Sequence, residues 1–198
     1  MAPDPLLLFD SGNLALDLLN TLRFPRGEVV DDLRTPQDLL AWLAGRGPAG
    51  GPYLAGALRS PPAARVLLTE AQNLRGDVGR LLGALQARGV IAPHTLYGVN
   101  RVLAASREAA TLHVEPGGAR LVEVEVGESS LAALSPIARA AARLVIDVDA
   151  DRVRRCASEE CARWFVDTSK GGRRRWCSMA TCGNRAKAAK HRARVERS

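Results

Sequence analysis

The chain has 198 residues, of which 46% are hydrophobic and 4% aromatic, and its formal net charge is +7. It can therefore bury a core built mostly of leucine, valine and alanine, and it holds no run of about eighteen apolar residues that would span a membrane. The first residues show neither a basic stretch before their leucines nor a small-residue cleavage site. We therefore expect no signal peptide and a cytoplasmic location.

The charge is unevenly distributed along the chain. Residues 152–198 hold fourteen Lys and Arg against four Asp and Glu, a net charge of +10, so the rest of the chain is at −3. Arginine is abundant throughout, and the clustering therefore carries more weight than the count. All the lysines (Lys170, Lys187 and Lys190) fall in this last quarter. The change of charge predicts two domains, residues 1–150 and residues 151–198.

Leucines at helical spacing predict a first helix over residues 11–23, where Leu14, Leu18 and Leu22 fall on one face. Polar residues fall on another face of this helix, namely Asp17, Asn20 and Thr21. This polar stripe could line a ligand pocket. A local hydrogen-bond network or a contact with a partner is the more economical explanation.

Capping signals predict the next two helices. Thr35 suits the N-cap of a second helix, Pro36 suits its first position, and glycines follow at residues 45–47. After a Gly- and Pro-rich loop, a long helix is expected to follow Ser60 and run to about residue 88. Glycines within it weaken it and could break it, at Gly76, Gly79 and Gly83.

The pattern then changes from helical spacing to alternation and back. Residues 92–106 predict a helix, residues 111–126 predict a β-hairpin around Pro-Gly-Gly, and residues 135–149 predict a last helix capped by Ser135. The N-terminal domain is therefore expected to be mainly helical within an α+β fold. His94 and His113 stand alone in their segments, and we interpret them as ordinary surface or core residues.

All the cysteines fall within residues 156–182, as Cys156, Cys161, Cys177 and Cys182. They form two C-x4-C pairs separated by fifteen residues. Zinc in structural sites takes four such ligands in a tetrahedron, and each short pair fits one turn. The pattern predicts one structural Zn²⁺ per chain, with two disulfides or free thiols as the alternatives.

The residues around the cysteines predict the order knuckle, hairpin, helix, which is that of a treble-clef zinc finger. Residues 163–167 and 173–176 are expected to pair as a hairpin, with Cys182 in the first turn of a helix. The small residues Ala186, Ala189 and Ala193 should seat this helix against the hairpin. Its opposite face is cationic.

The basic charge of the last quarter indicates a polyanionic partner. Four thiolates around Zn²⁺ leave about −2, and nearby arginines offset that charge, but +10 exceeds this need. Nucleic acid is the expected partner. An acidic protein surface, or a face that is merely solvated, is the alternative.

The segment "RRCASEECARWFVDTSKGGRRRWCSMATCGNRAKAAKHRAR" resembles the CGNR zinc-finger family, whose name-giving residues are Cys182, Gly183, Asn184 and Arg185. The segments "NLALDLLNTL" and "LRTPQDLLAWL" resemble the ABATE domain that usually precedes this finger. The resemblance implies a bacterial protein with an α+β N-terminal domain, four cysteine ligands to zinc, and a role as a stress-linked transcription regulator.

We therefore expect a non-enzymatic, zinc-containing DNA-binding regulator, whose N-terminal domain senses a ligand or mediates association. An RNA- or ribosome-associated protein is the first alternative, and an enzyme with its site in the N-terminal domain is the second. A zinc ion with four cysteine ligands has no open position for catalysis. The expected contacts to nucleic acid lie in the arginine-rich arm and the last helix: Arg173, Arg174, Arg175, Arg185, Lys187, Lys190 and Arg194.

Overall fold

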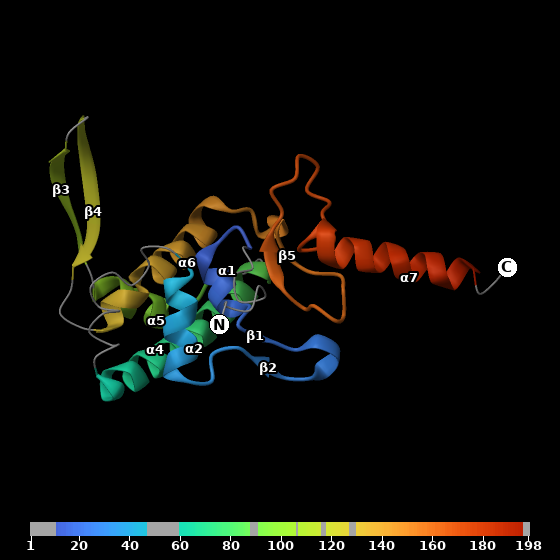
Figure 1. The fold of residues 1–198 in the computed structure, drawn as a ribbon, viewed down its shortest axis with the longest axis horizontal. Coiled ribbons are helices and arrows are strands. Elements are labelled where there is room, and N and C mark those ends of the chain that lie inside the picture. Colours follow the sequence, from blue (N-terminus) through green and yellow to red (C-terminus); the bar gives the residue numbers. More distant parts are fainter. Residues whose placement is uncertain are drawn as a thin grey trace.

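The computed structural model describes residues 11–46, 60–87, 91–105, 107–115, 118–126 and 130–195. A group of helices forms the N-terminal part, and a small irregular unit with the cysteine cluster follows it (Figure 1). The expected α+β class, mainly helical with a small finger at the C-terminus, is confirmed. No helix in the described ranges combines the length and the apolar character needed to cross a bilayer.

The first helix is shorter than expected. Helix α1 spans Leu14–Leu19 and begins at Asn13, whose side-chain oxygen accepts hydrogen bonds from the first N–H groups. The chain then turns into strand β1 (Leu22–Arg23), which pairs antiparallel with β2 (Val30–Asp31). Strands of two residues are too short to leave an alternating pattern, so the sequence did not predict them.

The second helix confirms its predicted cap. Helix α2 spans Pro36–Ala44, and Thr35 and Asp38 form a reciprocal capping box at its start. The long helix α4 (Pro61–Gln86) is confirmed and continuous, and its glycines do not break it. A row of buried apolar residues from Ala64 to Leu82 packs this helix along its length, and such packing outweighs the weak propensity of glycine.

The remaining helices of the N-terminal part lie against α4 and α1. Helix α5 (Pro93–Ala104) packs on α4 so closely that a Cβ at Gly98 would lie 1.7 Å from an Asp77 oxygen. Helix α6 (Ser135–Asp147) follows a short 3-10 turn (Ser130–Leu134), and Ser135 is its first residue, not the predicted cap. The hairpin is confirmed as strands β3 (Arg107–Glu115) and β4 (Gly118–Val126).

Helix α1 lies between two apolar clusters. Ala15 and Leu18 belong to the main core, which α2, α4, α5 and α6 complete. Leu16 belongs to a second cluster with Leu82, Leu144 and Val153. Because Val153 comes from the C-terminal quarter, this second cluster joins the two parts of the chain.

The C-terminal quarter is built differently from the expected order. Strand β5 (Val153–Arg155) pairs antiparallel with β6 (Trp164–Val166), so the strands flank the first cysteine pair. The predicted pairing of residues 163–167 with residues 173–176 is therefore wrong: β6 pairs with β5, and residues 173–176 form no strand. A π-helical turn (Met179–Gly183) leads directly into helix α7 (Asn184–Val195).

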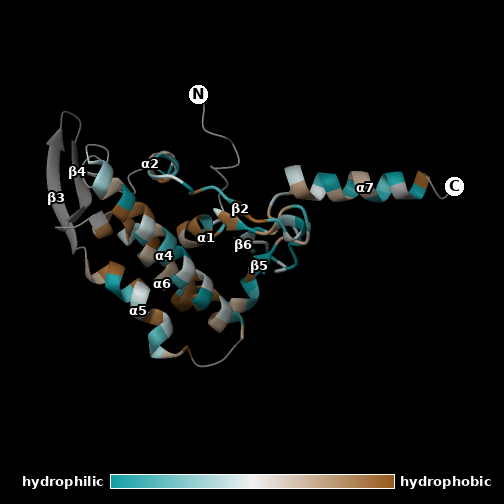
Figure 2. Cartoon of the chain, turned by 90° about the horizontal axis from the view of Figure 1, so that it is seen from below, coloured by the Kyte–Doolittle hydropathy of each residue, from teal (hydrophilic) through white to brown (hydrophobic). Residues whose placement is uncertain are grey.

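Helix α7 extends away from the rest of the molecule in both views (Figures 1 and 2). Ala186 is half-buried, but Ala189 and the lysines of the helix are exposed. The expectation that alanines seat this helix on a hairpin is therefore wrong, because no hairpin exists in residues 167–176 to receive it. The helix is attached through the turn at its N-terminus.

Candidate metal centre

The four cysteines converge as the spacing predicted. Their sulfur atoms all lie within 4.8 Å of one another, with 3.5 Å between Cys161 and Cys177 and 3.8 Å between Cys177 and Cys182. A tetrahedron with metal–sulfur bonds of about 2.3 Å places its sulfur atoms about 3.8 Å apart. The cluster therefore fits Zn²⁺ held by four thiolates. The cysteines are not joined in disulfides.

The first cysteine pair sits in the turn between β5 and β6. The N–H of Cys156 donates to the carbonyl of Arg163 (2.7 Å), and the N–H of Cys161 donates to the carbonyl of Ser158 (2.9 Å). Ala162 closes the turn with φ of 53°, a left-handed conformation. These bonds bring both sulfur atoms to the same side of the turn.

The second pair sits at the start of α7. Ser178 caps the π-helical turn, because its hydroxyl oxygen accepts from the N–H of Thr181. Cys182 follows in that turn and is buried, and Gly183 is buried beside it. A hydrogen bond from the N–H of Ala157 to the carbonyl of Arg175 (2.8 Å) ties the two knuckles together.

The crowded thiols perturb one another. Hydrogen bonds from Cys161 and Cys177 lower the pKa of Cys156, and the hydrogen bond with Cys156, together with burial, raises the pKa of Cys161 to about 11. The pKa of Cys177 is also raised. Four thiolates cannot coexist at this distance without a cation, and a divalent metal would remove that repulsion.

A small shell of side chains supports the cluster. Phe165 is buried against the cysteines, and the Arg174 guanidinium lies over its ring at 4.8 Å. Arg174 also donates to the carbonyls of Trp176 and Cys177. Asp167, 1% exposed, accepts from the N–H of Arg174 (2.8 Å) and from Ser169. Although burial raises the pKa of Asp167, these hydrogen bonds outweigh it and lower that pKa.

The polar stripe of α1 makes its contacts within the protein. Asp17 accepts from the N–H of Ser11 and pairs with Arg46 (2.6 Å). The Asn20 amide bonds both backbone groups of Trp164, at 2.7 and 2.8 Å. The Thr21 hydroxyl donates to the carbonyl of Leu18 and accepts from Arg75. These contacts favour a local hydrogen-bond network as the role of the polar stripe. A ligand pocket at these residues stays a prediction.

The residues expected to contact nucleic acid fall into two groups. Arg173, Arg175, Lys187, Lys190 and Arg194 are exposed. Arg174 is half-buried and holds backbone carbonyls near the cysteines, so the structure gives it a supporting position. Arg185 pairs with Glu160 at 2.7 Å. The group therefore divides into exposed cations and two cations, Arg174 and Arg185, whose contacts near the cysteine cluster are described above.

Glu160, which no motif in the sequence singles out, bridges the two parts of the chain. It pairs with Arg185 at the start of α7 and with Arg26 in the β1–β2 turn. Hydrogen bonding from Arg185, together with the Arg26 charge, lowers the pKa of Glu160. The two arginines lie far from it in the sequence, and only the folded chain shows this contact.

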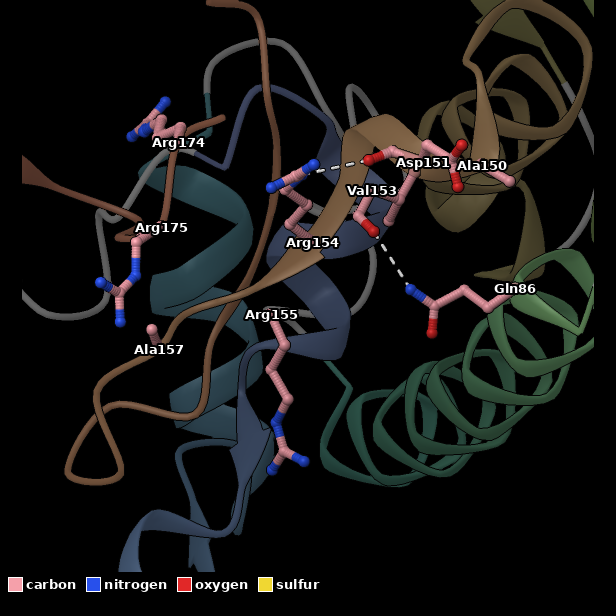
Figure 3. A pocket seen from close by; sticks show the side chains of 9 residues that line it. All are labelled: Gln86, Ala150, Asp151, Val153, Arg154, Arg155, Ala157, Arg174 and Arg175. Carbon is pink, nitrogen blue, oxygen red and sulfur yellow. Dashed lines mark hydrogen bonds between the residues drawn. The ribbon is translucent and has the colours of Figure 1, made fainter. Parts of the chain in front are cut away.

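A second feature missed from the sequence is a pocket of about 530 Å³ beside β5 (Figure 3). Both parts of the chain line it, since Gln86 comes from the end of α4 and donates to the carbonyl of Val153 (3.1 Å). Its cationic side chains are Arg154, Arg155, Arg174 and Arg175.

A helical N-terminal part joined to a four-cysteine knuckle that carries a basic helix defines a zinc-finger protein. Residues 152–195 match the family "CGNR zinc finger", and residues 12–148 match the ABATE family, described as "Putative stress-induced transcription regulator". The chain belongs to the ABATE family and carries a CGNR zinc finger at its C-terminal side. A comparison with curated proteins found no match.

Proposed function

We propose that this protein is a cytoplasmic, non-enzymatic transcription regulator that binds DNA through its zinc finger. The observation that carries the proposal is the basic helix α7, which projects from a metal-anchored turn with its lysines exposed. A net charge of +10 over residues 152–198 favours association with a polyanion. Because the chain belongs to a family described as a transcription regulator, we propose that this polyanion is DNA.

The geometry of α7 supports this function. An isolated helix of twelve residues is marginally stable in water. Here the cysteine turn fixes one end of the helix, while Lys190, Arg192 and Arg194 lie toward its C-terminus, where cations complement the helix dipole. Phosphate groups along the exposed face would hold the helix further, and contacts of this kind position a protein on DNA without reading its sequence.

The alternatives receive less support. Binding single-stranded RNA by stacking needs exposed aromatic rings, but Trp164 and Trp176 are half-buried, and Arg175 covers the Trp176 ring at 5.1 Å. A zinc ion with four thiolate ligands offers no position to a substrate. We also propose that the N-terminal part senses a ligand and thereby regulates DNA binding by the finger.

The proposal is tested by measuring affinity for duplex DNA, single strands and structured RNA over a range of salt concentrations. With about five phosphate contacts, log K for duplex DNA should fall with log salt at a slope of about −4 to −5. Mapping of bound sites across the genome would then identify the target. An affinity independent of salt, or a clear preference for structured RNA, would contradict the proposal.

A further inference from the structure

The arginine-lined pocket beside β5 extends beyond helix α7, which carries the proposed function. It lies where the end of α4, the turn at Ala150–Arg152, strand β5 and the arm before Cys177 come together. Besides its arginines it holds one carboxylate, that of Asp151. The charge of the lining is therefore strongly positive.

Two of the four arginines are occupied by the protein itself. The Arg154 Nε donates to the carbonyl of Asp151 (3.1 Å) and lies 3.7 Å from Asp167. The Arg174 guanidinium holds the carbonyls beside the cysteines. In Figure 3 the Arg154 side chain turns toward Asp151. Arg174 shapes the pocket and has little capacity left for a ligand, and the nearby Asp167 carboxylate offsets part of the Arg154 charge.

The other two arginines retain most of their donors. Among the described residues, Arg155 makes one hydrogen bond, at 3.4 Å to the carbonyl of Ala162. The Arg175 guanidinium lies over the Trp176 ring, which leaves the N–H groups at its edge available. Both side chains are exposed, and in Figure 3 their guanidinium groups lie on either side of Ala157.

We propose that this pocket is a phosphate-binding site, with Arg155 and Arg175 as its binding residues. A guanidinium presents its N–H donors as a planar fork that matches phosphate oxygens. Two such residues line one open pocket of about 530 Å³, and their two positive charges suit a doubly charged ligand of this kind. The phosphate belongs either to a nucleic-acid backbone or to a small phosphorylated molecule. The first of these two possibilities rests on the proposed function.

The position of the pocket gives this binding a consequence. Gln86 comes from the N-terminal part and Arg175 from the finger, and in Figure 3 they lie at opposite sides of the pocket, so a ligand in it lies between the two parts. The side of the pocket formed by the N-terminal part is held in place, because the Gln86 amide donates a hydrogen bond to the carbonyl of Val153. A phosphate group there would stabilise the junction between the two parts of the chain.

The first arm of the test uses the zinc-loaded full chain and inorganic phosphate at constant ionic strength, with chloride as the reference anion. The arginine Nε–H signals of Arg155 and Arg175 are followed by NMR. Both signals should shift in a saturable way, and the Arg155→Gln, Arg175→Gln double variant should bind phosphate at least about tenfold more weakly, since two charge-assisted bonds are lost.

The matched control is Arg65→Gln. Arg65 is exposed near the start of α4, about 30 Å from Gln86 along the helix. It carries the same charge change away from the pocket and should leave phosphate binding unchanged. If the double variant loses zinc, Arg175→Lys takes its place, because it keeps the charge and removes the planar fork. Phosphate binding by Arg175→Lys should then weaken several-fold.

The second arm identifies the source of the phosphate. If it is a nucleic-acid backbone, the double variant should reduce the magnitude of the salt slope for duplex DNA by about 1.8. An unchanged slope together with weakened phosphate binding assigns the site to a small phosphorylated molecule. If the double variant and Arg65→Gln bind phosphate and DNA alike, the pocket is not a phosphate site. A parent chain that binds no DNA would contradict the proposed function, while the NMR arm still decides the pocket.

Discussion

The two parts of the chain are held together by different physical means. In the N-terminal part, leucines and alanines from α1, α2, α4, α5 and α6 are fully buried in one continuous cluster. In the described part of the finger, Phe165 and the cysteines make up most of a small core. A core of this size is too small to order a chain alone, so we expect a bound metal to supply the missing free energy.

The two parts of the chain also differ in where their charged side chains lie. In the N-terminal part, two of the described arginines are largely buried and pair with aspartates, as Arg75 does with Asp31 and Arg46 with Asp17. In the finger, arginines and lysines mostly face outward. The comparison indicates that charge stabilises the structure in the first part and is available to partners in the second.

The largest effect should follow loss of the metal, which would break the finger and spare the helices. Replacing Cys177, which is buried, by Ala should abolish zinc binding and remove on the order of 10 kcal/mol of stabilisation from the finger. Elemental analysis measures the zinc content, and limited trypsin digestion measures the unfolding of the finger. The Ala180→Ser variant in the same turn is the control. A parent chain with well under one zinc and a folded finger would contradict the metal assignment.

The next largest effect should come from the buried ion pair of the helical part. Arg75, 6% exposed, donates to both Asp31 oxygens at 2.7 and 2.8 Å. The Asp31→Asn variant leaves that guanidinium without its counter-charge and should cost about 3 kcal/mol of unfolding free energy. Zinc content should stay the same. The exposed pair of Arg80 with Asp77 is the control, and Arg80→Gln should cost less than about 1 kcal/mol.

The same pair predicts a dependence on pH. Burial alone raises the pKa of Asp31, but hydrogen bonds from Arg75 and from the N–H of Leu33 outweigh it and lower the pKa from its ordinary value of 3.8. The stabilisation is therefore present above pH 3.8 and is lost as the pH falls through the lower value of the folded state. The difference between parent and Asp31→Asn in urea unfolding should shrink at that acidic end. A constant difference would contradict this assignment.

The sequence predicted what depends on local chemistry. The capping pattern at Thr35, the alternation of residues 111–126 and the spacing of the cysteines each carry their own physical reason. Each was confirmed because the interacting residues are near neighbours in the chain or share a strict ligand geometry.

The sequence-based prediction failed where two nearby segments competed for one strand, or where a distant segment decided the outcome. Strand β6 pairs with β5, which precedes the first cysteine, and not with the arginine-rich arm that follows. The low helix propensity of glycine suggested that α4 could break, whereas packing along the whole helix keeps it continuous. The Asn20–Trp164 contact and the arginine-lined pocket depend on how the two parts dock, and no spacing in the sequence records that.

A moderate effect should come from the junction between the parts. The Asn20 side chain satisfies the N–H and the carbonyl of Trp164, and the Asn20→Ala variant removes both bonds. We expect a loss of about 2 kcal/mol in urea unfolding, because buried backbone groups lose their partners. Asn100→Ala, on the exposed face of α5, is the matched control. Equal stability of the two variants would mean that the finger and the helices fold independently.

The smallest effects should separate the outward cations of α7 from the one that is already paired. Lys187 is exposed, and its replacement by Gln should reduce the magnitude of the salt slope for duplex DNA by about 0.9. The Arg185 guanidinium is held by Glu160 at 2.7 Å, so part of its charge is neutralised within the protein. Arg185→Gln should therefore change the slope by less than Lys187→Gln, while Glu160→Gln should strengthen DNA binding by releasing Arg185 and Arg26. Equal slopes for the two cation variants would mean that Arg185 leaves Glu160 to contact DNA, and an unchanged slope for both would place the binding surface away from α7.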